Sequence, residues 1–288
     1  SSLVTGVQTC ALPIYQTPVS ETDRPVLGMV VGNKKTLMID AGNSEAHAQY
    51  FLEELAKRNV PRPDILALTH WHWDHIFGLS SLKEVVSIAQ VETKEAMEKL
   101  IPLSWSDEAL DERVQEGTEI EFCSTAIKKE FPHHRNIVIA LPEVTFDDRV
   151  EVDLGGVTCV LQHVGGDHSS DSVVIYVKEE KILFLGDSIY ANIFAPKSNY
   201  TVQKIRSLLD KLATFDEAET YVLSHSGTIT KAEFKAEVAL FRAIATFTKE
   251  YKGNASKIKP AYEKQIGRTS NEDELETVEY FVNGWNIG

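Results

Sequence analysis

Alternating hydrophobic and polar positions in the first quarter of the chain predict a β-hairpin followed by a strand–helix–strand unit. The segments VLGMVVG (26–32) and TLMIDAG (36–42) have the apolar content of strands and meet at a Gly-Asn-Lys-Lys turn. Ser44 is typical of a helix N-cap, and it precedes EAHAQYFLEELAKR (45–58), whose apolar residues recur at helical spacing. The apolar stretch DILALT (64–69) predicts the next strand, which gives the order of a βαβ unit.

Strands and helices continue to alternate along the rest of the chain. A strand is expected at 85–91, then a hairpin with a Gly155-Gly156 turn, then a second hairpin over 172–187 that turns through Glu179 and Glu180. The remaining expectations are a helix at 202–215, a strand at 218–225, one long helix at 228–253 and a last helix at 271–285.

This order predicts one α/β domain over residues 26–253, followed by a helical C-terminal tail at 254–288. The stretch 92–149 interrupts the alternation, and we interpret it as an insertion that covers the functional site. Its aromatic residues Trp105, Phe122 and Phe131 are candidates for lining a substrate pocket, although residues of this kind more often pack in a core.

The first fifteen residues fit none of these patterns and lack the features of a secretory signal. They resemble translated sequencing-adapter sequence from environmental gene assemblies, so we expect residues 1–15 to be a non-native or disordered leader of a bacterial protein. An ordinary terminus that forms an edge strand is the alternative. A cytoplasmic location is expected, while the uncertain true N-terminus leaves an export signal open.

Composition narrows the classes of partner. The 288 residues carry a formal net charge of −14, which opposes nucleic acid and anionic membrane surfaces and leaves a small-molecule substrate. The three cysteines are widely spaced and odd in number, so they predict neither a disulfide framework nor a zinc–cysteine site. No transmembrane run is present, and a homodimer is compatible with the sequence.

The run HWHWDH (70–75), directly after the strand at 64–69, carries the candidate chemistry. In an extended loop, alternation would place His70, His72 and Asp74 on one side, with the two tryptophans on the other. His70 and His72 could then bind one cation, and Asp74 with His75 a second cation roughly 3.5–4 Å away, as in two-metal hydrolytic sites. The run therefore predicts a two-metal centre.

This motif and three later segments resemble the metallo-β-lactamase superfamily, with lactonases and hydroxyacylglutathione hydrolases as the subtypes with similar dinuclear sites. The later segments are VGGDHSSDSVVIYV (164–177), LFLGDSIY (183–190) and VLSHSG (222–227), in the order of the family's remaining ligand motifs. The resemblance implies a four-layer αβ/βα sandwich and two zinc ions, with iron or manganese as alternatives. It also implies the metal ligands His70, His72, Asp74, His75, His168, Asp187 and His225.

The resemblance implies three further roles. Asp187 would bridge the two metals, Asp40 would support the metal loop, and Tyr190 would hydrogen-bond a scissile carbonyl as in lactonases of this superfamily. For Asp40 a simple strand-end cap, and for Tyr190 an ordinary packed aromatic, remain alternatives.

The third ligand of the first metal is open between His163 and His168. The segment departs from the family's T-P-G-H pattern, because Val164-Gly165 replaces Thr-Pro and Asp167 is an apparent extra residue. The match to the family loop favours His168.

The ligand types predict a zinc-dependent hydrolase that uses a metal-bridging hydroxide, with Asp74 orienting it, to cleave a lactone, ester, thioester or β-lactam. Lactones and esters are favoured for two reasons. Tyr190 resembles the tyrosine of lactonases, and hydrolysis of β-lactam antibiotics in the periplasm would require an export signal, which is not visible. A phosphodiesterase or nuclease on the same scaffold is one alternative, opposed by the acidic charge. An iron-dependent redox protein is another, opposed by His72 where flavodiiron proteins have Glu and by the lack of a flavodoxin domain. A domain that binds metal without turnover is the last.

Overall fold

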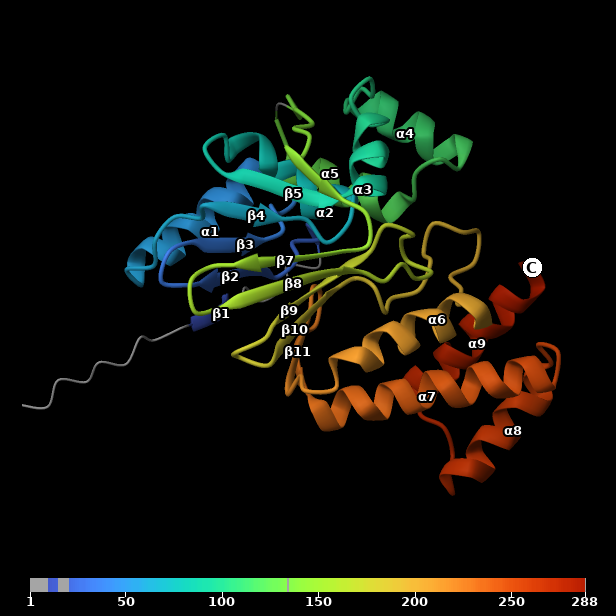
Figure 1. Cartoon of the computed structure of the whole chain (residues 1–288). Helices are drawn as coiled ribbons and strands as arrows, with labels where there is room; N and C mark the ends of the chain where they lie inside the picture. The colour runs from blue at the N-terminus through green and yellow to red at the C-terminus, as the bar shows by residue number, and fades with distance from the viewer. Residues whose placement is uncertain (1–9, 15–20, 134, 288) are drawn as a thin grey trace, which may run out of the picture.

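The structure is a computed structural model that describes residues 10–14, 21–133 and 135–287. Within these residues the strands form two six-stranded sheets that face each other (Figure 1). The first sheet consists of β1 (Cys10–Ile14), β2 (Leu27–Val31), β3 (Thr36–Ile39), β4 (Ile65–Ala67), β5 (Val86–Gln90) and β6 (Val144–Phe146), in that spatial order. The second consists of β7 (Arg149–Asp153), β8 (Thr158–His163), β9 (Val173–Val177), β10 (Ile182–Gly186), β11 (Thr220–Leu223) and β12 (Gly227–Thr230), ordered from β12 to β7.

Both sheets are mixed. The hairpins β2–β3, β7–β8 and β9–β10 pair antiparallel, as their turn residues predict, and Gly155 and Gly156 adopt the positive φ angles that a tight turn requires. The pairs β3–β4, β4–β5, β5–β6 and β10–β11 are parallel, so helices must cross between their strands.

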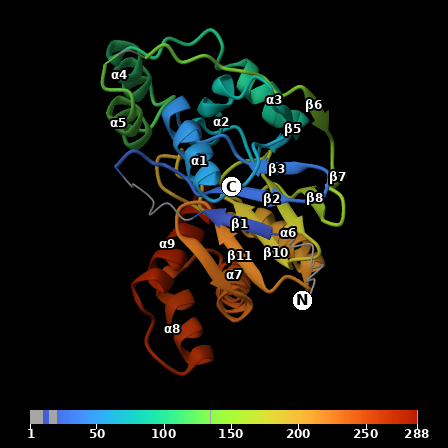
Figure 2. The same ribbon diagram turned by 90° about the vertical axis from the view of Figure 1, so that its left-hand side faces the viewer.

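Helices cover both outer faces of the two sheets. The elements on the first sheet's side are α1 (Glu45–Lys57), α2 (Trp73–Ile76), η1 (Phe77–Ser81), α3 (Val91–Glu98), α4 (Asp107–Glu116) and α5 (Glu121–Glu130). Those on the second sheet's side are α6 (Val202–Leu212), η2 (Ala213–Phe215), α7 (Lys231–Glu250), α8 (Ala255–Ile266) and α9 (Glu272–Ile287). Figures 1 and 2 show the two helical groups on opposite sides of the sheets. The predicted four-layer α/β sandwich is therefore confirmed.

Apolar side chains from the two sheets meet between them. Leu37 and Ile39 of the first sheet and Ile175 and Phe184 of the second belong to one buried cluster. Because these strands are buried on both faces, they read as nearly continuous apolar runs in the sequence. Burial of this kind supplies the main free energy that holds the two sheets together.

Two predicted segments differ in detail from the structure. The long helix expected at 228–253 is wrong at its start, because Gly227–Thr230 forms β12 and pairs antiparallel with β11 before α7 begins. Thr230 then closes a capping box with Glu233, which fixes the start of the helix at Lys231. The predicted leader lies largely outside the described residues; its residues 10–14 form β1, which pairs with β2 at the sheet edge.

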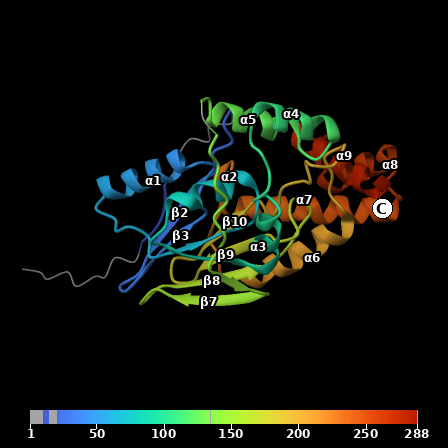
Figure 3. The same ribbon diagram turned by 90° about the horizontal axis from the view of Figure 1, so that it is seen from above.

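The segment 92–149 contains most of α3, all of α4 and α5, and the edge strand β6. The C-terminal helices α8 and α9 lie beyond one end of the sheets, at the same end as α4 (Figure 3). None of the described helices is both long and apolar enough to span a membrane.

Candidate metal centre

The HWHWDH run leaves β4 at the end of the sheet and changes conformation within the run. His70 to His72 are non-helical, but α2 begins at Trp73, and the His75 N–H donates to the His72 carbonyl. An extended loop through Asp74 is therefore wrong from Trp73 onward. The helical turn brings Asp74 and His75 together on the site, while Trp73 is buried and packs in the core beside the site.

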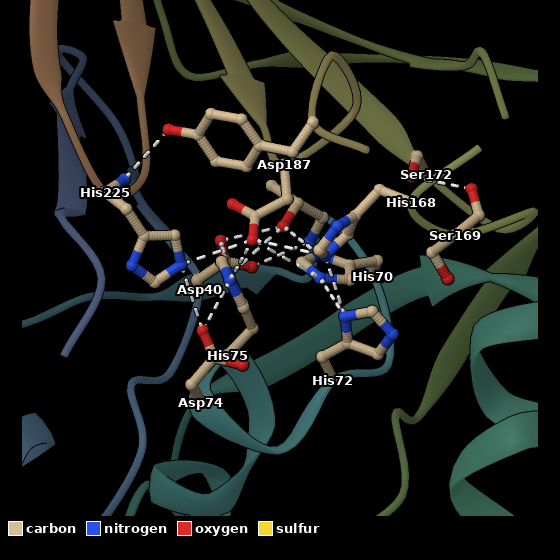
Figure 4. A network of polar contacts seen from close by, with 12 residues as sticks. Asp40, His70, His72, Asp74, His75, His168, Ser169, Ser172, Asp187 and His225 are labelled. Carbon is tan, nitrogen blue, oxygen red and sulfur yellow. Dashed lines mark hydrogen bonds and ion pairs between the residues drawn. The ribbon is translucent and has the colours of Figure 1, made fainter. Parts of the chain in front are cut away.

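Three histidines form the first cluster (Figure 4). His70 Nε2 lies 3.0 Å from His72 Nδ1, which lies 3.0 Å from His168 Nε2. All three side chains are buried. Burial and the neighbouring imidazoles hold the pKa values of His70 and His72 well below the ordinary value, so both rings are neutral and offer lone pairs.

Asp74, His75, Asp187 and His225 form the second cluster. His75 Nε2 lies 3.0 Å from Asp74 Oδ2, and His225 Nε2 lies 3.3 Å from the same oxygen and 3.2 Å from Asp187 Oδ2. Asp187 Oδ2 is also 3.4 Å from His168 Nε2 in the first cluster. Asp187 therefore stands between the two clusters, in the position that the family resemblance implies for a bridging ligand.

Charge is strongly coupled in the second cluster. Burial opposes the charged form of His75 and His225, but the surrounding carboxylates outweigh it and raise both pKa values well above the ordinary value. These carboxylates are Asp74, Asp40 and Asp187 for His75, and Asp187 and Asp74 for His225. Burial likewise opposes the charged form of Asp74 and Asp187, but the histidines hold their pKa values well below the usual range. Without a cation the two histidines are therefore protonated and the two aspartates are ionised.

The two clusters fit a pair of divalent cations. Asp187 Oδ1 is buried and makes no hydrogen bond within the described residues, and such an atom is costly unless something binds it. Asp74 Oδ2 and His75 Nε2 are also buried, and their ion pair leaves both atoms facing the space between the ligand side chains. A hydrogen bond joins only two of three converging imidazole nitrogens, whereas a cation satisfies all three. Imidazole and carboxylate ligands suit zinc and also accept iron or manganese.

The opposite nitrogens of the ligand rings are held by groups behind them. The Asp40 carboxylate lies 2.8 Å from His75 Nδ1 and accepts from the N–H and the hydroxyl of Thr69 at 2.7 and 2.8 Å. The Ala191 carbonyl lies 3.0 Å from His168 Nδ1. Such partners fix the tautomer and orientation of ligand histidines. Asp40 therefore does more than cap its strand.

Asp23 is a site residue that the sequence reasoning missed. Its Oδ1 lies 3.4 Å from His225 Nδ1, and burial, with the nearby Asp74 charge, raises its pKa to about 7. It precedes the first predicted strand by three residues and lies about 200 positions from His225, so neither periodicity nor motif spacing gives a signal for it.

The structure places His168, and not His163, in the first cluster. His163 is the last residue of β8, and its Nε2 lies 2.8 Å from the Ser170 carbonyl. The loop between these two histidines, residues 164–167, is held by its own backbone geometry and hydrogen bonds. Gly165 and Gly166 adopt positive φ angles, and the Asp167 carboxylate accepts from the Thr201 N–H and hydroxyl at 2.8 and 2.9 Å. The apparent extra residue thus ties the loop to the start of α6.

A cavity of about 450 Å³ opens onto the two clusters. Its walls include Phe122 of α5, the loop residues Tyr190, Phe194 and Tyr200, and Glu276 and Tyr280 of α9. Of the three aromatic candidates, only Phe122 lines this cavity; Trp105 and Phe131 pack in the core against Phe77. Arg24 also lines it, but its guanidinium donates to both oxygens of Glu130, at 3.1 and 2.7 Å.

Tyr190 lies beside both clusters. Its ring centroid is 6.1 Å from those of His168 and His225. Its hydroxyl accepts from the His225 backbone N–H at 3.3 Å and lies 3.3 Å from Ser226 Oγ. Burial, with the Asp187 charge, raises the pKa of this hydroxyl, so it keeps its proton at neutral pH.

Two mixed sheets flanked by helices, with paired His/Asp clusters where their loops meet, define an α/β metal-dependent hydrolase. The family model described as the Metallo-beta-lactamase superfamily matches residues 22–225, and the chain belongs to this superfamily.

Individual relatives are distant. The chain is 26% identical to the acyl-coenzyme A thioesterase MBLAC2 of Gallus gallus over 205 residues, 66% of this chain and 69% of that protein. The solved metallo-beta-lactamase from Pontibacter korlensis aligns with a TM-score of 0.53 at 17% identity, over 76% of this chain and 87% of that one. A double mutant of the sec-alkyl sulfatase PisA1 aligns at 0.59 and 14% identity, over 91% of this chain and 46% of that one. The two solved structures share the fold.

Proposed function

We propose that this metallo-hydrolase cleaves the ester-type bond of a neutral acyl compound, with lactones and esters as preferred substrates. The observation that carries this is the character of the cavity. Away from the metal-ligand side chains its walls are rich in aromatic residues, namely Trp73, Phe122, Tyr190, Phe194, Tyr200 and Tyr280. Arg24, the one lysine or arginine among the described residues that line it, is already paired with Glu130. An apolar acyl group fits such walls, whereas a phosphodiester or sulfate would lack a free cationic side chain.

Two divalent cations held by the seven ligand side chains would polarise the carbonyl and lower the pKa of the attacking water toward ~7. Asp74 is held ionised, so it can accept a hydrogen bond from that water and orient it. The Tyr190 hydroxyl accepts the His225 N–H, and where Ser226 Oγ also donates to it, its own proton can be donated to the carbonyl oxygen as negative charge develops there.

A thioester is the second candidate, because the curated relative MBLAC2 is named as an acyl-coenzyme A thioesterase. A coenzyme A leaving group carries several phosphate charges, and both the net charge of −14 and the pairing of Arg24 weigh against it. A thioester with a small leaving group meets neither objection.

The test is a substrate panel on zinc-loaded protein. It contains acyl-homoserine lactones, p-nitrophenyl esters, acyl-coenzyme A and acyl-glutathione of matched acyl chains, a cephalosporin, bis-p-nitrophenyl phosphate and an alkyl sulfate. We expect the highest kcat/KM for a lactone or ester. Turnover of the phosphodiester or sulfate without any carbonyl hydrolysis would overturn the proposal, and a clear preference for acyl-coenzyme A would select the second candidate.

A further inference from the structure

The segment 21–26, which precedes β2, is fastened to three different parts of the fold. The Val26 N–H donates at 2.7 Å to the carbonyl of Ser224, the residue directly before His225 in the chain. Arg24 forms its two hydrogen bonds with Glu130 at the end of α5, and Asn43 Nδ2 donates to the Thr22 carbonyl at 2.6 Å. Glu130 also accepts from Ser44, the N-cap of α1. The segment is therefore held on both sides of Asp23.

Asp23 sits at the centre of these anchors in a left-handed backbone conformation, with φ of 52°. This conformation is strained for a residue other than glycine and persists where surrounding contacts enforce it. Its consequence here is that the carboxylate points toward His225, with Oδ1 3.4 Å from Nδ1.

His225 needs such a partner more than the other ligand histidines do. It lies in the short turn between β11 and β12, and its side chain is 24% exposed, whereas the side chains of His70 and His75 are fully buried. His75 and His168 have the Asp40 carboxylate and the Ala191 carbonyl behind their second nitrogens. Asp23 is the described group that takes the corresponding place behind His225.

We infer that Asp23 is a positioning residue for the second metal: its carboxylate accepts from His225 Nδ1–H and so directs the Nε2 lone pair toward Asp74 and Asp187. The segment 21–26 thereby supports a ligand set whose members, Asp74, His75, Asp187 and His225, come from the ends of β4, β10 and β11. The inference rests on the metal pair and is independent of which substrate is cleaved.

The test compares three variants by metal binding. Asp23→Gly removes the carboxylate without adding backbone strain, so a loss of metal affinity in this variant comes from the missing carboxylate. Asp23→Asn keeps a hydrogen-bond acceptor and tolerates a positive φ. Asn59→Gly is the matched control, because exposed Asn59 also has a positive φ, of 57°, and lies in the turn after α1.

Metal-free protein is titrated with Zn²⁺ against a chromophoric chelator, and with Co²⁺ by its visible spectrum. We expect the parent protein and Asn59→Gly to bind two ions. In Asp23→Gly the affinity of the site that contains His225 should fall about 10–100-fold, as for other outer partners of ligand histidines, while the affinity of the other site is kept. The affinity of this site in Asp23→Asn should lie between those of the parent protein and Asp23→Gly. The melting temperature of metal-free Asp23→Gly should not decrease.

Equal affinities for Asp23→Gly and the parent would overturn the inference. So would equal weakening of both sites together with a lower melting temperature, because that result would give Asp23 a purely structural role. Since the readout is metal binding, a failure of the substrate proposal leaves this test unaffected.

Discussion

His163 and His168 stand five residues apart in the chain, yet only one of them reaches the metal centre. Strand alternation cannot choose between them, because the outcome depends on the turn that separates them. Gly165 and Gly166 take positive φ angles, and a Cβ on Gly166 would lie 2.7 Å from the Ser188 carbonyl. This close approach lets the loop fold back so that His168 enters the cluster and His163 stays at the end of β8.

The first prediction compares these two histidines. His168→Ala should reduce metal affinity by more than the ~10–100-fold expected for an outer partner, because a ligand itself is removed. His163→Ala removes only a hydrogen bond to the Ser170 carbonyl and should cost about 0.5–1.5 kcal/mol of stability with two metals retained. Metal content after gel filtration, measured beside the melting temperature, checks both. Loss of metal from His163→Ala alone would reverse the assignment.

At the scale of elements, the C-terminal helix α9 supports the loop that forms one wall of the cavity. The Tyr200 N–H donates to the Tyr280 carbonyl at 3.0 Å, and Asn283 Nδ2 donates to the Ser198 carbonyl at 3.0 Å. The contact is close because Gly284 has no side chain: a Cβ there would lie 2.0 Å from the Tyr200 carbonyl oxygen. The helix lies outside the matched range 22–225, yet it shapes the cavity.

The second prediction follows from that close packing. Gly284→Ala should push α9 away from the loop, lower stability by about 1–3 kcal/mol as overpacking does, and raise KM more than it lowers kcat, because Tyr200 and Tyr280 line the cavity but not the clusters. Glu279→Ala, at an exposed position of the same helix, is the control. Thermal unfolding and steady-state kinetics on the best substrate measure the two effects. An unchanged KM in a destabilised Gly284→Ala would show that α9 has no influence on substrate binding.

Elements with a strong period could be predicted from the sequence, and short or sterically decided ones could not. The hairpins, α1 and α6 follow from apolar spacing and turn residues, and the fold follows from their order. Gly227–Thr230 is too short to show a strand period next to a long amphipathic helix, so the sequence pattern wrongly assigns most of β12 to that helix. The turn of α2 inside HWHWDH was missed for the same reason, since four residues carry no helical periodicity.

At the scale of the whole molecule, the centre is assembled from both halves. The first sheet supplies His70, His72, Asp74 and His75 from one loop, and loops of the second sheet supply His168, Asp187 and His225. The resemblance to family motifs could identify these residues, because each lies in such a motif at the end of a predicted strand or in the loop after it. Partners such as Asp23 and the Ala191 carbonyl could not be identified, because only the packing of distant segments brings them to the rings.

The two clusters differ in charge, and this difference predicts how metal binding depends on pH. In the metal-free protein His70 and His72 have lowered pKa values and are neutral at pH 7, so the first cluster accepts a cation without releasing their protons. His75 and His225 have raised pKa values and are protonated, so a cation must displace two protons from the second cluster. Each displaced proton weakens affinity about tenfold per unit fall in pH. Between pH 7.5 and 6.5 the second site should therefore lose about 100-fold.

Calorimetric titration of metal-free protein with Zn²⁺ measures this directly. Repeated in buffers of different ionisation enthalpy, it should show about two protons released in one binding event and fewer in the other. Asp40→Asn provides a control, because it removes one of the carboxylates that raise the pKa of His75 and should reduce the number of protons released. Equal proton release in both events would mean that the two clusters do not differ in charge. Release confined to the event that Asp23→Gly weakens would tie the proton-linked site to His225.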